Sequence, residues 1–587
     1  MSMRKTSKIL LALTLSALFC TAVSAQQKTD SIAPEAATAR ATAKLVTAKN
    51  YMVAAANPLA AKAGYDMLAK GGNAIDAMVA VQTVLGLVEP QSSGLGGGAF
   101  LVYFDAGKQK LSTYDGRETA PMAATPQLFQ DANGKPLKFY DAVVGGRSVG
   151  TPGTPRLLYD THAKKGKLPW AEVLAPAIKL ATEGFKVSNR LHMLIEKDQE
   201  RLSRFKATAD YFLPNGTPLQ VGATLKNPAY AHVLTRLAAE GPSAFYRGEI
   251  ASDIVKTVQT AAGNPGVLAL EDLQGYTIKQ RPAVCTAYRA YEICGMGPPS
   301  SGALTVGQIL GQLEPYDLAA LGPQNPESWR LIGDASRLAF ADRGRYMADS
   351  DFVPMPTKGL VNKDYLQQRA KLLTGPKALD SAQVTAGTPP WDHASLQADD
   401  ESIELPSTSH FSIVDTQGNA VSMTTTIENG FGSRLMTNGF LLNNELTDFS
   451  FRTHKNGVPI ANRVEPSKRP RSSMAPTIVL QNGKPVIVVG SPGGSRIIGY
   501  VAQSLIAMID WQMDVQAAIN MPHAVNRFGT YDLEKGTDAE KLQAPLEAMG
   551  FKVNLRDLNS GLHGIVIGND GLQGGADPRR EGVVVGN

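Results

Sequence analysis

Apolar positions along the chain follow a helical spacing in some segments and a strand-like spacing in others. Residues 57–72 predict a helix that opens on Asn-Pro and closes on Gly-Gly. Asn73 is a capping residue for a second helix over residues 74–88, which is apolar on nearly every side and should be buried. Residues 99–104 and 110–114 have the composition of strands.

The pattern changes sharply near residue 408. Residues 155–373 are mainly amphipathic and helical, which is typical of a scaffold, and residues 374–406 have no periodicity and predict an exposed, flexible stretch. Dense strand signal follows at 408–414 and 420–427. Strands followed by helices in both halves predict a layered α+β protein, and the abrupt junction is a place where a processing site would be accessible.

Composition is that of a globular protein with a large core. The 587 residues are 43% hydrophobic and 19% charged. Lys and Arg number 58 against 53 Asp and Glu, and this small surplus creates no strong field for nucleic acid.

The first 25 residues predict a signal peptide. Three basic residues among the first eight precede an apolar run at 9–19, and Val23-Ser24-Ala25 supplies a cleavage site after Ala25. Cys20 leaves a lipoprotein anchor as an alternative, although the large Phe19 precedes it. No later apolar stretch is long enough to span a membrane, so we expect an exported protein, periplasmic or secreted.

Two cysteines remain after that cleavage. Residues 284–294 alternate like two strands joined at Arg289-Ala290, which would set Cys285 opposite Cys294 with Cα atoms roughly 4.5 Å apart. That separation suits a disulfide in an oxidising compartment. The alternative is two reduced thiols on adjacent strands, and neither state suggests catalysis.

A hairpin centred on Gln417 brings two threonines together. Thr408 lies nine residues before Gln417 and Thr426 nine after, so a symmetric turn places their hydroxyls opposite each other. A Thr at the start of a chain carries its own base in the free α-amine. Thr408 could create that amine by attacking the carbonyl of Ser407, giving an ester that water opens. Taken alone, Thr408 is also an ordinary strand residue.

A glycine turn at residues 490–495 joins a strand at 486–489 to a helix at 496–509. Its backbone N–H groups, which include those of Gly493 and Gly494, could point at an anion near the helix start. No Lys-Ser or Lys-Thr follows, so this is not a phosphate-binding P-loop. The alternatives are an oxyanion hole for acyl transfer and a plain strand-to-helix turn.

Several polar residues stand in otherwise apolar or turn-like surroundings. Arg117 can grip a carboxylate, the hydroxyls of Ser472 and Ser473 can donate to the same group, and Glu445 with Asp448 can hold an ammonium. Together they fit the head of an α-amino acid. Individually, each is also explained as a solvated surface group.

Other chemistry has little support in the sequence. His410 shares a strand face with Thr408, but an N-terminal Thr needs no His base and no carboxylate is evident to orient the ring, so we interpret it as structural. Three Cys and eight dispersed His form no metal-binding motif.

The chain closely resembles the gamma-glutamyltransferases, which are also called gamma-glutamyltranspeptidases or glutathione hydrolases and belong to the N-terminal nucleophile hydrolases. The resemblance runs from about residue 49 to the C-terminus. It is carried by seven motifs: EPQSSGLGGG at 89–98, DGRETAP at 115–121, PPSSG at 298–302, TSHFS at 408–412, LNNE at 442–445, RPRSSM at 469–474 and GSPGGSR at 490–496.

The resemblance implies an αββα sandwich formed jointly by a large chain, 26–407, and a small chain, 408–587. It implies that Thr408 cuts the chain after Ser407 and then serves as the nucleophile, with Thr426 bonded to it. Gly493 and Gly494 match the oxyanion hole. The α-carboxylate ligands correspond to Arg117, Ser472 and Ser473, and the α-amino ligands to Glu428, Glu445 and Asp448.

The implied reaction attacks a γ-glutamyl amide such as glutathione, forms an acyl-enzyme on Thr408 and transfers the acyl group to water, an amino acid or a dipeptide. No metal or organic cofactor is implied. Glu428 and Glu445 depart from the Asn and Gln of several relatives, which makes the ammonium pocket more acidic and should favour a cationic amine. The connection from Asp448 to Ser472 is also short compared with relatives in which it forms a lid.

An open pocket of that kind could admit bulkier acyl groups, as in the related glutaryl-cephalosporin acylases. Asp448 would hold an α-amine that glutaryl groups lack, so the sequence favours the transferase over the acylase. A third reading is an unprocessed relative that only binds amino-acid-like ligands. A binder would need neither Thr408 nor Thr426.

Overall fold

The computed structural model describes residues 37–38, 43–391, 396–400, 402 and 404–587. The predicted signal peptide, residues 1–25, lies outside the described residues. Among the helices described, none is both long and apolar enough to cross a membrane.

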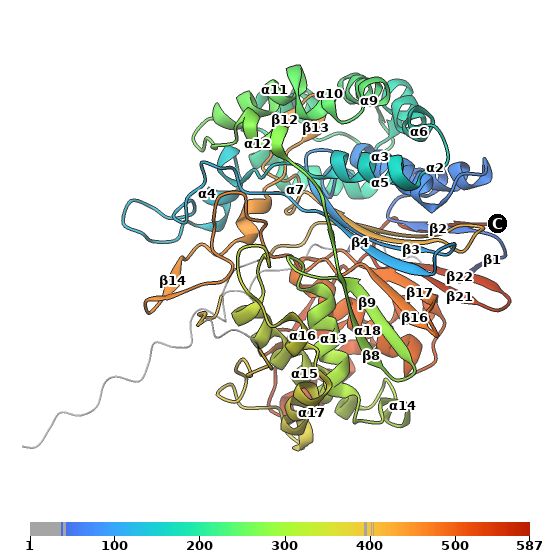
Figure 1. Ribbon diagram of the computed structural model, residues 1–587, viewed down its shortest axis with the longest axis vertical. Helices are drawn as coiled ribbons and strands as arrows, with labels where there is room; N and C mark the ends of the chain where they lie inside the picture. The colour runs from blue at the N-terminus through green and yellow to red at the C-terminus, as the bar shows by residue number, and fades with distance from the viewer. Residues whose placement is uncertain (1–36, 39–42, 392–395, 401, 403) are drawn as a thin grey trace, which may run out of the picture.

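Two seven-stranded sheets lie face to face at the centre of the molecule (Figure 1). The first runs in the order β1 (Val46–Ala48), β22 (Gly571–Ala576), β21 (His563–Gly568), β17 (Lys484–Gly490), β16 (Thr477–Gln481), β9 (Tyr291–Met296) and β8 (Ala283–Tyr288). The second runs in the order β23 (Val583–Gly586), β2 (Met52–Ala55), β10 (Ser409–Val414), β11 (Ala420–Thr426), β3 (Gly98–Asp105), β4 (Lys110–Gly116) and β7 (Lys279–Arg281). Every pairing in both sheets is antiparallel.

Helices cover the outer face of each sheet, which gives four layers. Those on the second sheet include α2 (Pro58–Ala69), α3 (Ala74–Val88), α5 (Thr154–Lys165), α6 (Trp170–Glu183) and α9 (Pro228–Glu240). Those on the first include α13 (Gly302–Leu313), α15 (Pro326–Tyr346), α18 (Ile497–Ile509) and α19 (Val515–Asn520). Further helices extend the two outer layers: α7 (Asn189–Leu202), α8 (Lys206–Phe212), α10 (Ser243–Tyr246), α11 (Gly248–Gln259), α12 (Leu270–Gly275), α14 (Leu318–Leu321), α16 (Thr357–Leu360), α17 (Lys363–Ala370) and α20 (Gln543–Ala548).

Three apolar cores separate these layers. One lies between each sheet and its helices, and the third fills the space between the sheets with side chains such as Met52, Phe104, Ile478 and Val488. Both faces of the central strands β10 and β11 are therefore buried, although their sequences include several Ser and Thr residues. The predicted αββα sandwich is confirmed.

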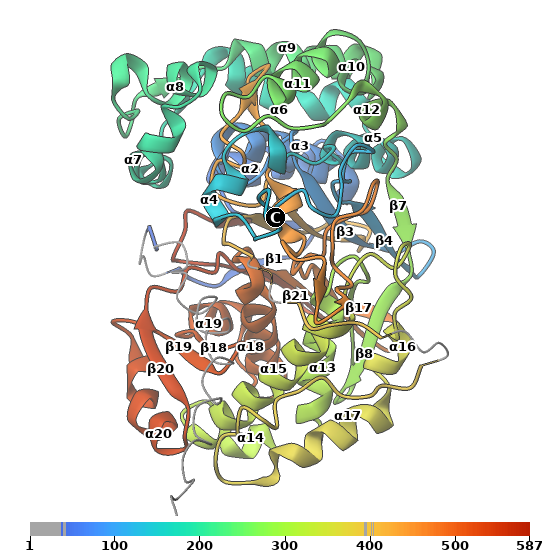
Figure 2. The ribbon, with the colours of Figure 1, turned by 90° about the vertical axis from the view of Figure 1, so that its left-hand side faces the viewer.

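Each of the two sheets contains strands that precede residue 408 and strands that follow it. In the second sheet, β10 lies between β2 and β11, and the C-terminal strand β23 pairs with the opposite edge of β2. In the first, β16 pairs with β9. A cut before residue 408 would therefore leave two chains that share both sheets, as Figure 2 also suggests from the mixing of colours at the centre.

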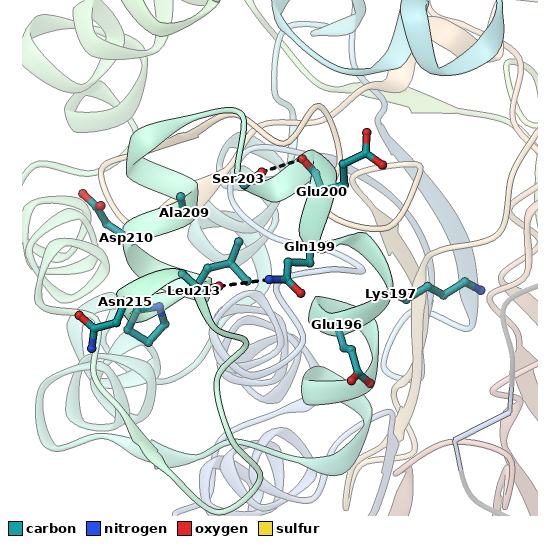
Figure 3. A pocket seen from close by; sticks show the side chains of 11 residues that line it. Glu196, Lys197, Gln199, Glu200, Ser203, Ala209, Asp210, Leu213 and Asn215 are labelled. Carbon is teal, nitrogen blue, oxygen red and sulfur yellow. Dashed lines mark hydrogen bonds between the residues drawn. The ribbon is translucent and has the colours of Figure 1, made fainter.

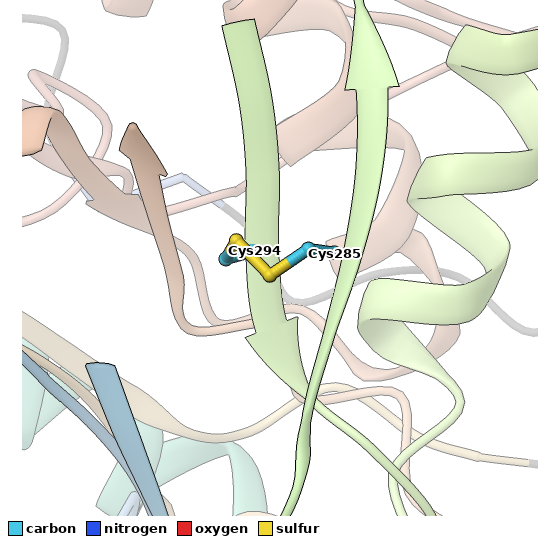
Figure 4. The surroundings of a disulfide bond; sticks show 2 residues. All are labelled: Cys285 and Cys294. Atoms are coloured by element: carbon cyan, nitrogen blue, oxygen red, sulfur yellow. A yellow bond between two sulfur atoms is a disulfide. The ribbon is translucent and has the colours of Figure 1, made fainter. Parts of the chain in front are cut away.

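The cysteine hairpin has the predicted register. Cys285 on β8 faces Cys294 on β9 with Cα atoms 4.1 Å apart, and the two form a disulfide (Figure 4). The turn falls at Arg289, whose φ of 55° is left-handed.

The prediction for residues 374–406 was wrong at its C-terminal end. Glu404 and Leu405 are buried there, and Ser407 and Thr408, next along the chain, are only 1% and 3% exposed. The junction between loop and strand is therefore inside the protein rather than accessible on its surface. The reason is that Glu404 has charged partners there, described below, which offset the loss of its hydration.

Candidate active site

Thr408 lies beside the peptide bond that precedes it. Its hydroxyl hydrogen-bonds to the carbonyl oxygen of Ser407, and its Oγ1 lies 3.3 Å from Oγ1 of Thr426. The Thr426 hydroxyl donates to the same Ser407 carbonyl at 3.2 Å and accepts from the backbone N–H of Glu428 at 2.8 Å. Two hydroxyls thus converge on one carbonyl group.

The turn between β10 and β11 fixes this geometry. Asp415 accepts from the backbone N–H groups of Gln417 and Asn419, both at 2.9 Å, and Gly418 has a φ of 80° that suits glycine. The other Asp415 oxygen accepts from Ala74 at the start of α3. With the turn held from two sides, the register runs from Val414 opposite Ala420 to Ser409 opposite Thr425, and the next pair outward is Thr408 with Thr426.

The glycine turn lies against the segment before Thr408. Gly493 and Gly494 have φ values of 135° and 59°, and they lead through a short 3₁₀ turn into α18. A Cβ on Gly494 would stand 2.8 Å from the carbonyl oxygen of Leu405. Glycine is therefore required here both by backbone conformation and by the close approach of that segment.

Four buried carboxyl groups and one guanidinium, that of Arg117, lie close together on one wall of the site. Arg117 pairs with both Glu445 and Asp448, and all three side chains are buried. The Glu428 carboxylate accepts from the amide of Asn444, and the buried Glu118 lies close enough to Arg117 to raise its pKa.

Burial dominates the titration of this wall. It raises the pKa of Glu428, with the negative charge of Glu445 adding to the effect, to about 8. Burial also raises the pKa of Asp448 and of Glu118 well above their usual range. It opposes the charge on Arg117, but Glu445 and Asp448 outweigh it and raise the pKa of that guanidinium. The wall therefore has more carboxyl groups than cations to balance them, which suits a ligand that brings an ammonium.

A basic wall adjoins this one, and its two arginines, Arg343 and Arg471, contact the lining residues Glu404 and Ser473. Ser473 donates to the carboxylate of Glu404 and accepts from Arg343 at 2.7 Å, and Arg343 also pairs with Glu404. The Nε of Arg471 lies 3.6 Å from the same Glu404 carboxylate, and its NH2 lies 3.0 Å from Asp400. Ser473 is thus part of a cluster in which residues before Thr408 supply the carboxylates.

Ser472 lies next to this cluster. Its Oγ accepts from the backbone N–H of Met474 at 3.1 Å, and its carbonyl oxygen accepts from both the N–H and the hydroxyl of Ser301. These bonds anchor the loop that contains Ser472 and Ser473 to the start of α13.

The structure brings all the predicted site residues except Gly493 to the lining of one cavity of about 20 Å³. The lining consists of Arg117, Glu404, Leu405, Ser407, Thr408, Thr426, Glu428, Glu445, Asp448, Ser472, Ser473, Met474, Gly494 and Ile497. That volume holds little more than one water molecule, because residues 404–407 occupy the site.

A larger hollow of about 900 Å³ lies elsewhere, between α7, α8 and the turn at residues 214–216. Figure 3 shows Glu196, Lys197 and Asp210 on separate parts of its rim with their charged ends turned apart.

His410 has structural partners only. Its ring nitrogens contact Thr424 and Ser412 at 2.9 and 3.2 Å, and burial lowers its pKa well below the usual value. In the part of the chain that the structure describes, no group of three or more His, Cys, Asp or Glu side chains could hold a metal ion.

Comparison with known proteins agrees with this geometry. The sequence model of the gamma-glutamyltranspeptidase family matches residues 60–587. The chain belongs to the gamma-glutamyltranspeptidase family. It is 38% identical over 553 residues to a glutathione hydrolase proenzyme of Bacillus subtilis strain 168, covering 92% of each chain. It is 37% identical over 549 residues to that of Escherichia coli K12, covering 91% of each.

Solved structures extend the comparison to a second activity. A cephalosporin acylase from Bacillus halodurans superposes with a TM-score of 0.82 at 27% identity, over 93% of this chain and 97% of that one. Both kinds of relative are enzymes, and the first kind is described as a proenzyme.

Sequence reasoning missed three residues of the site. Arg471 lies in the RPRSSM motif, where its position alone indicates no role. Arg343 stands in the helical region that we interpreted as scaffold, and Glu404 in the stretch that we expected to be exposed. One feature of the sequence could have indicated this basic cluster, namely the position of Arg471 directly before Ser472 and Ser473. Nothing in the spacing connects Arg343 with Glu404.

Proposed function

We propose that this family member is the precursor of a γ-glutamyltransferase and glutathione hydrolase that cuts its own chain between Ser407 and Thr408. The observation that carries the proposal is the contact of the Thr408 hydroxyl with the Ser407 carbonyl, which also accepts from Thr426. In the proposed step, Thr408 Oγ1 bonds to the Ser407 carbonyl carbon, the peptide C–N bond breaks, and the hydroxyl proton of Thr408 passes to the leaving nitrogen. This gives an ester and a free α-amine on Thr408.

Water then opens the ester. The products are a large chain ending at Ser407, with residues 26–407, and a small chain of residues 408–587. They remain together as a heterodimer because the two sheets contain strands of both. The apolar segment near the N-terminus supports export, with residues 1–25 removed and the enzyme periplasmic or secreted.

In the mature enzyme the α-amine of Thr408 takes the proton from its own hydroxyl as Oγ1 attacks the γ-carbonyl of the substrate. Gly493 and Gly494 would stabilise the oxyanion. The leaving amine takes that proton, and the resulting ester transfers its γ-glutamyl group to water, an amino acid or a dipeptide. No step calls for a cofactor.

We assign the α-ammonium and the α-carboxylate of the substrate to different residues of the site. Glu428, Glu445 and Asp448 would hold the α-ammonium, which the excess of carboxyl groups on that wall supports. Arg117, Ser472 and Ser473 would donate to the α-carboxylate. Residues 404–407 fill this space before processing, so their departure has to precede substrate binding.

The alternative is a glutaryl-type acylase, which the likeness to a cephalosporin acylase favours. The acidic wall argues against it, because a glutaryl group brings no ammonium to balance the carboxylates.

Intact mass and N-terminal sequencing of the purified protein test the processing step. We expect two chains, one beginning at Thr408, from the wild type and a single chain from Thr408→Ala. One uncut chain from the active wild type would contradict the proposal. Initial rates on L-γ-glutamyl-p-nitroanilide and glutaryl-p-nitroanilide then separate the two activities, and faster cleavage of the glutaryl substrate would favour the acylase.

A further inference from the structure

The carboxylate of Glu404 occupies a site that binds carboxylates. It is buried and pairs with Arg343 and with Ser473, and a second guanidinium, that of Arg471, lies 3.6 Å away. Burial opposes the charge on Glu404, but Arg343 and Arg471 outweigh it and lower the pKa of this carboxyl. It is therefore bound as an anion.

The two arginines are neutralised by carboxylates that precede the proposed cleavage site. Arg343 and Arg471 are both buried, and burial together with the charge of Arg471 lowers the pKa of Arg343. Their carboxylate partners are Glu404, for both, and Asp400, for Arg471. Glu404 lines the cavity close to Ser407, so a chain end that leaves the cavity takes it along, whereas Asp400 is held by hydrogen bonds to Gly344 and Asn462. Two buried guanidinium groups that lose the one carboxylate they share are in an unfavourable state.

Arg117 supplies no comparable net charge. Its guanidinium already pairs with Glu445 and Asp448, and two backbone carbonyls, of Pro470 and Arg471, take further donors. The cavity is therefore divided into an acidic wall that contains Arg117 and a basic wall around Ser473.

We propose that Arg343 and Arg471 add two cations to the substrate-carboxylate site of Arg117, Ser472 and Ser473, and that the Glu404 carboxylate occupies the place of the ligand carboxylate in the precursor. The ligand is a carboxylate on the acyl side of the scissile amide. The inference rests on the proposed function and deepens it, since it adds two binding residues and explains what neutralises them before the cut.

Three substrates that differ by one group each test the proposal in processed enzyme. L-γ-Glutamyl-p-nitroanilide has both head groups, glutaryl-p-nitroanilide has only the carboxylate, and 4-aminobutyryl-p-nitroanilide has only the amine. Arg471→Met should lower kcat/KM by about 10- to 100-fold on the two carboxylate substrates, the loss of one charge-assisted bond. It should change the value for the 4-aminobutyryl substrate by less than about threefold.

Arg345→Met is the matched control. Arg345 is on the same helix as Arg343 but pairs at the surface with Asp399, so this variant should cleave all three substrates at the wild-type rate. An equal loss on all three substrates in Arg471→Met would overturn the inference. Wild-type protein that is uncut, or that cleaves none of the three substrates, would instead contradict the proposed function.

A second experiment needs no catalysis. In the uncut Thr408→Ala protein, Glu404→Ala empties the carboxylate site while the rest of the segment stays in place. Sodium acetate should raise the melting temperature of Thr408→Ala/Glu404→Ala above its value in sodium chloride of equal ionic strength. The Thr408→Ala parent should show no such difference. The same response in both proteins would overturn the inference.

Discussion

The hydroxyl of Thr426 donates to the carbonyl oxygen of Ser407 at 3.2 Å, while the Oγ1 of Thr408 lies 3.3 Å from the same hydroxyl oxygen. Thr426 therefore contacts both partners of the proposed self-cleavage. It is placed to stabilise the negative charge that develops on the Ser407 oxygen when Thr408 attacks.

Removal of this hydroxyl should slow processing. We expect Thr426→Val to lengthen the half-time of chain cleavage by about 100-fold, the usual effect of losing one donor to an oxyanion, whereas Thr426→Ser should process at nearly the normal rate. Denaturing gel electrophoresis over time measures both. Thr425→Val is the control, because that hydroxyl bonds to Gly98 instead. Processing of Thr426→Val at the wild-type rate would show that the contact has no role.

Asp448 should decide between γ-glutamyl and glutaryl substrates. Asp448→Asn removes a carboxyl group that can ionise against the ammonium of the substrate, so kcat/KM for L-γ-glutamyl-p-nitroanilide should fall by about 10- to 100-fold. The value of kcat/KM for glutaryl-p-nitroanilide should stay the same or rise, because this substrate has no ammonium group that could lose Asp448 as a partner. Asp399→Asn, at the surface, should alter neither. A parallel fall on both substrates would mean that Asp448 acts through Arg117 rather than on the amine.

The contribution of Glu428 to the stability of the uncut protein should fall as the pH rises from about 4.5 to about 8. Burial and Glu445 raise the pKa of Glu428 to about 8, so the folded state keeps a proton there that the unfolded state has lost. Stability contributed in this way is present at low pH and falls with rising pH, by up to about 1.4 kcal/mol per pH unit for one group.

Glu428→Gln in the Thr408→Ala background isolates that contribution. Gln keeps an oxygen that can accept from Leu405 or Asn444, and it has no proton to lose. The difference in unfolding free energy between Glu428→Gln and its parent should therefore grow across this pH window, as measured by urea titration. Glu196→Gln, an exposed residue, should give a constant difference. A constant difference for Glu428→Gln would mean that Glu428 is ionised throughout.

The disulfide should add stability without affecting turnover. It closes a short hairpin, for which about 2–3 kcal/mol is expected. Cys285→Ala/Cys294→Ala should melt a few degrees lower than the wild type in oxidising buffer, and the same as the wild type after reduction. Initial rates at 25 °C should be unchanged, because β8 is at the edge of its sheet and contributes no residue to the cavity lining. A wild-type melting temperature that does not respond to reductant would contradict this expectation.

The sequence alone was enough to predict the pairing of residues within two hairpins, because short-range geometry controls it. The symmetric turn around Gln417 set Thr408 opposite Thr426, and the alternation around Arg289 set Cys285 opposite Cys294, because strand pairing has a period of two. The family resemblance supplied the four-layer arrangement, which no periodicity in the chain determines.

The basic wall could not be predicted in the same way. Arg343 on α15, Glu404 in the segment before Thr408 and Arg471 in a later loop meet only through tertiary packing. In sequence, Glu404 has the surroundings of an exposed loop, and only its partners make its burial favourable.

Strand β10 lies between β2 and β11, and β23 closes the far side of β2. While the chain is intact, recovery from unfolding is a first-order process whose rate does not depend on dilution. After the cut, the separated chains have to meet before either sheet can form, so recovery becomes second order and slows as the protein is diluted. Self-cleavage would thus make the fold easy to reach from the newly made single chain and difficult to recover once the two cut chains have unfolded and separated.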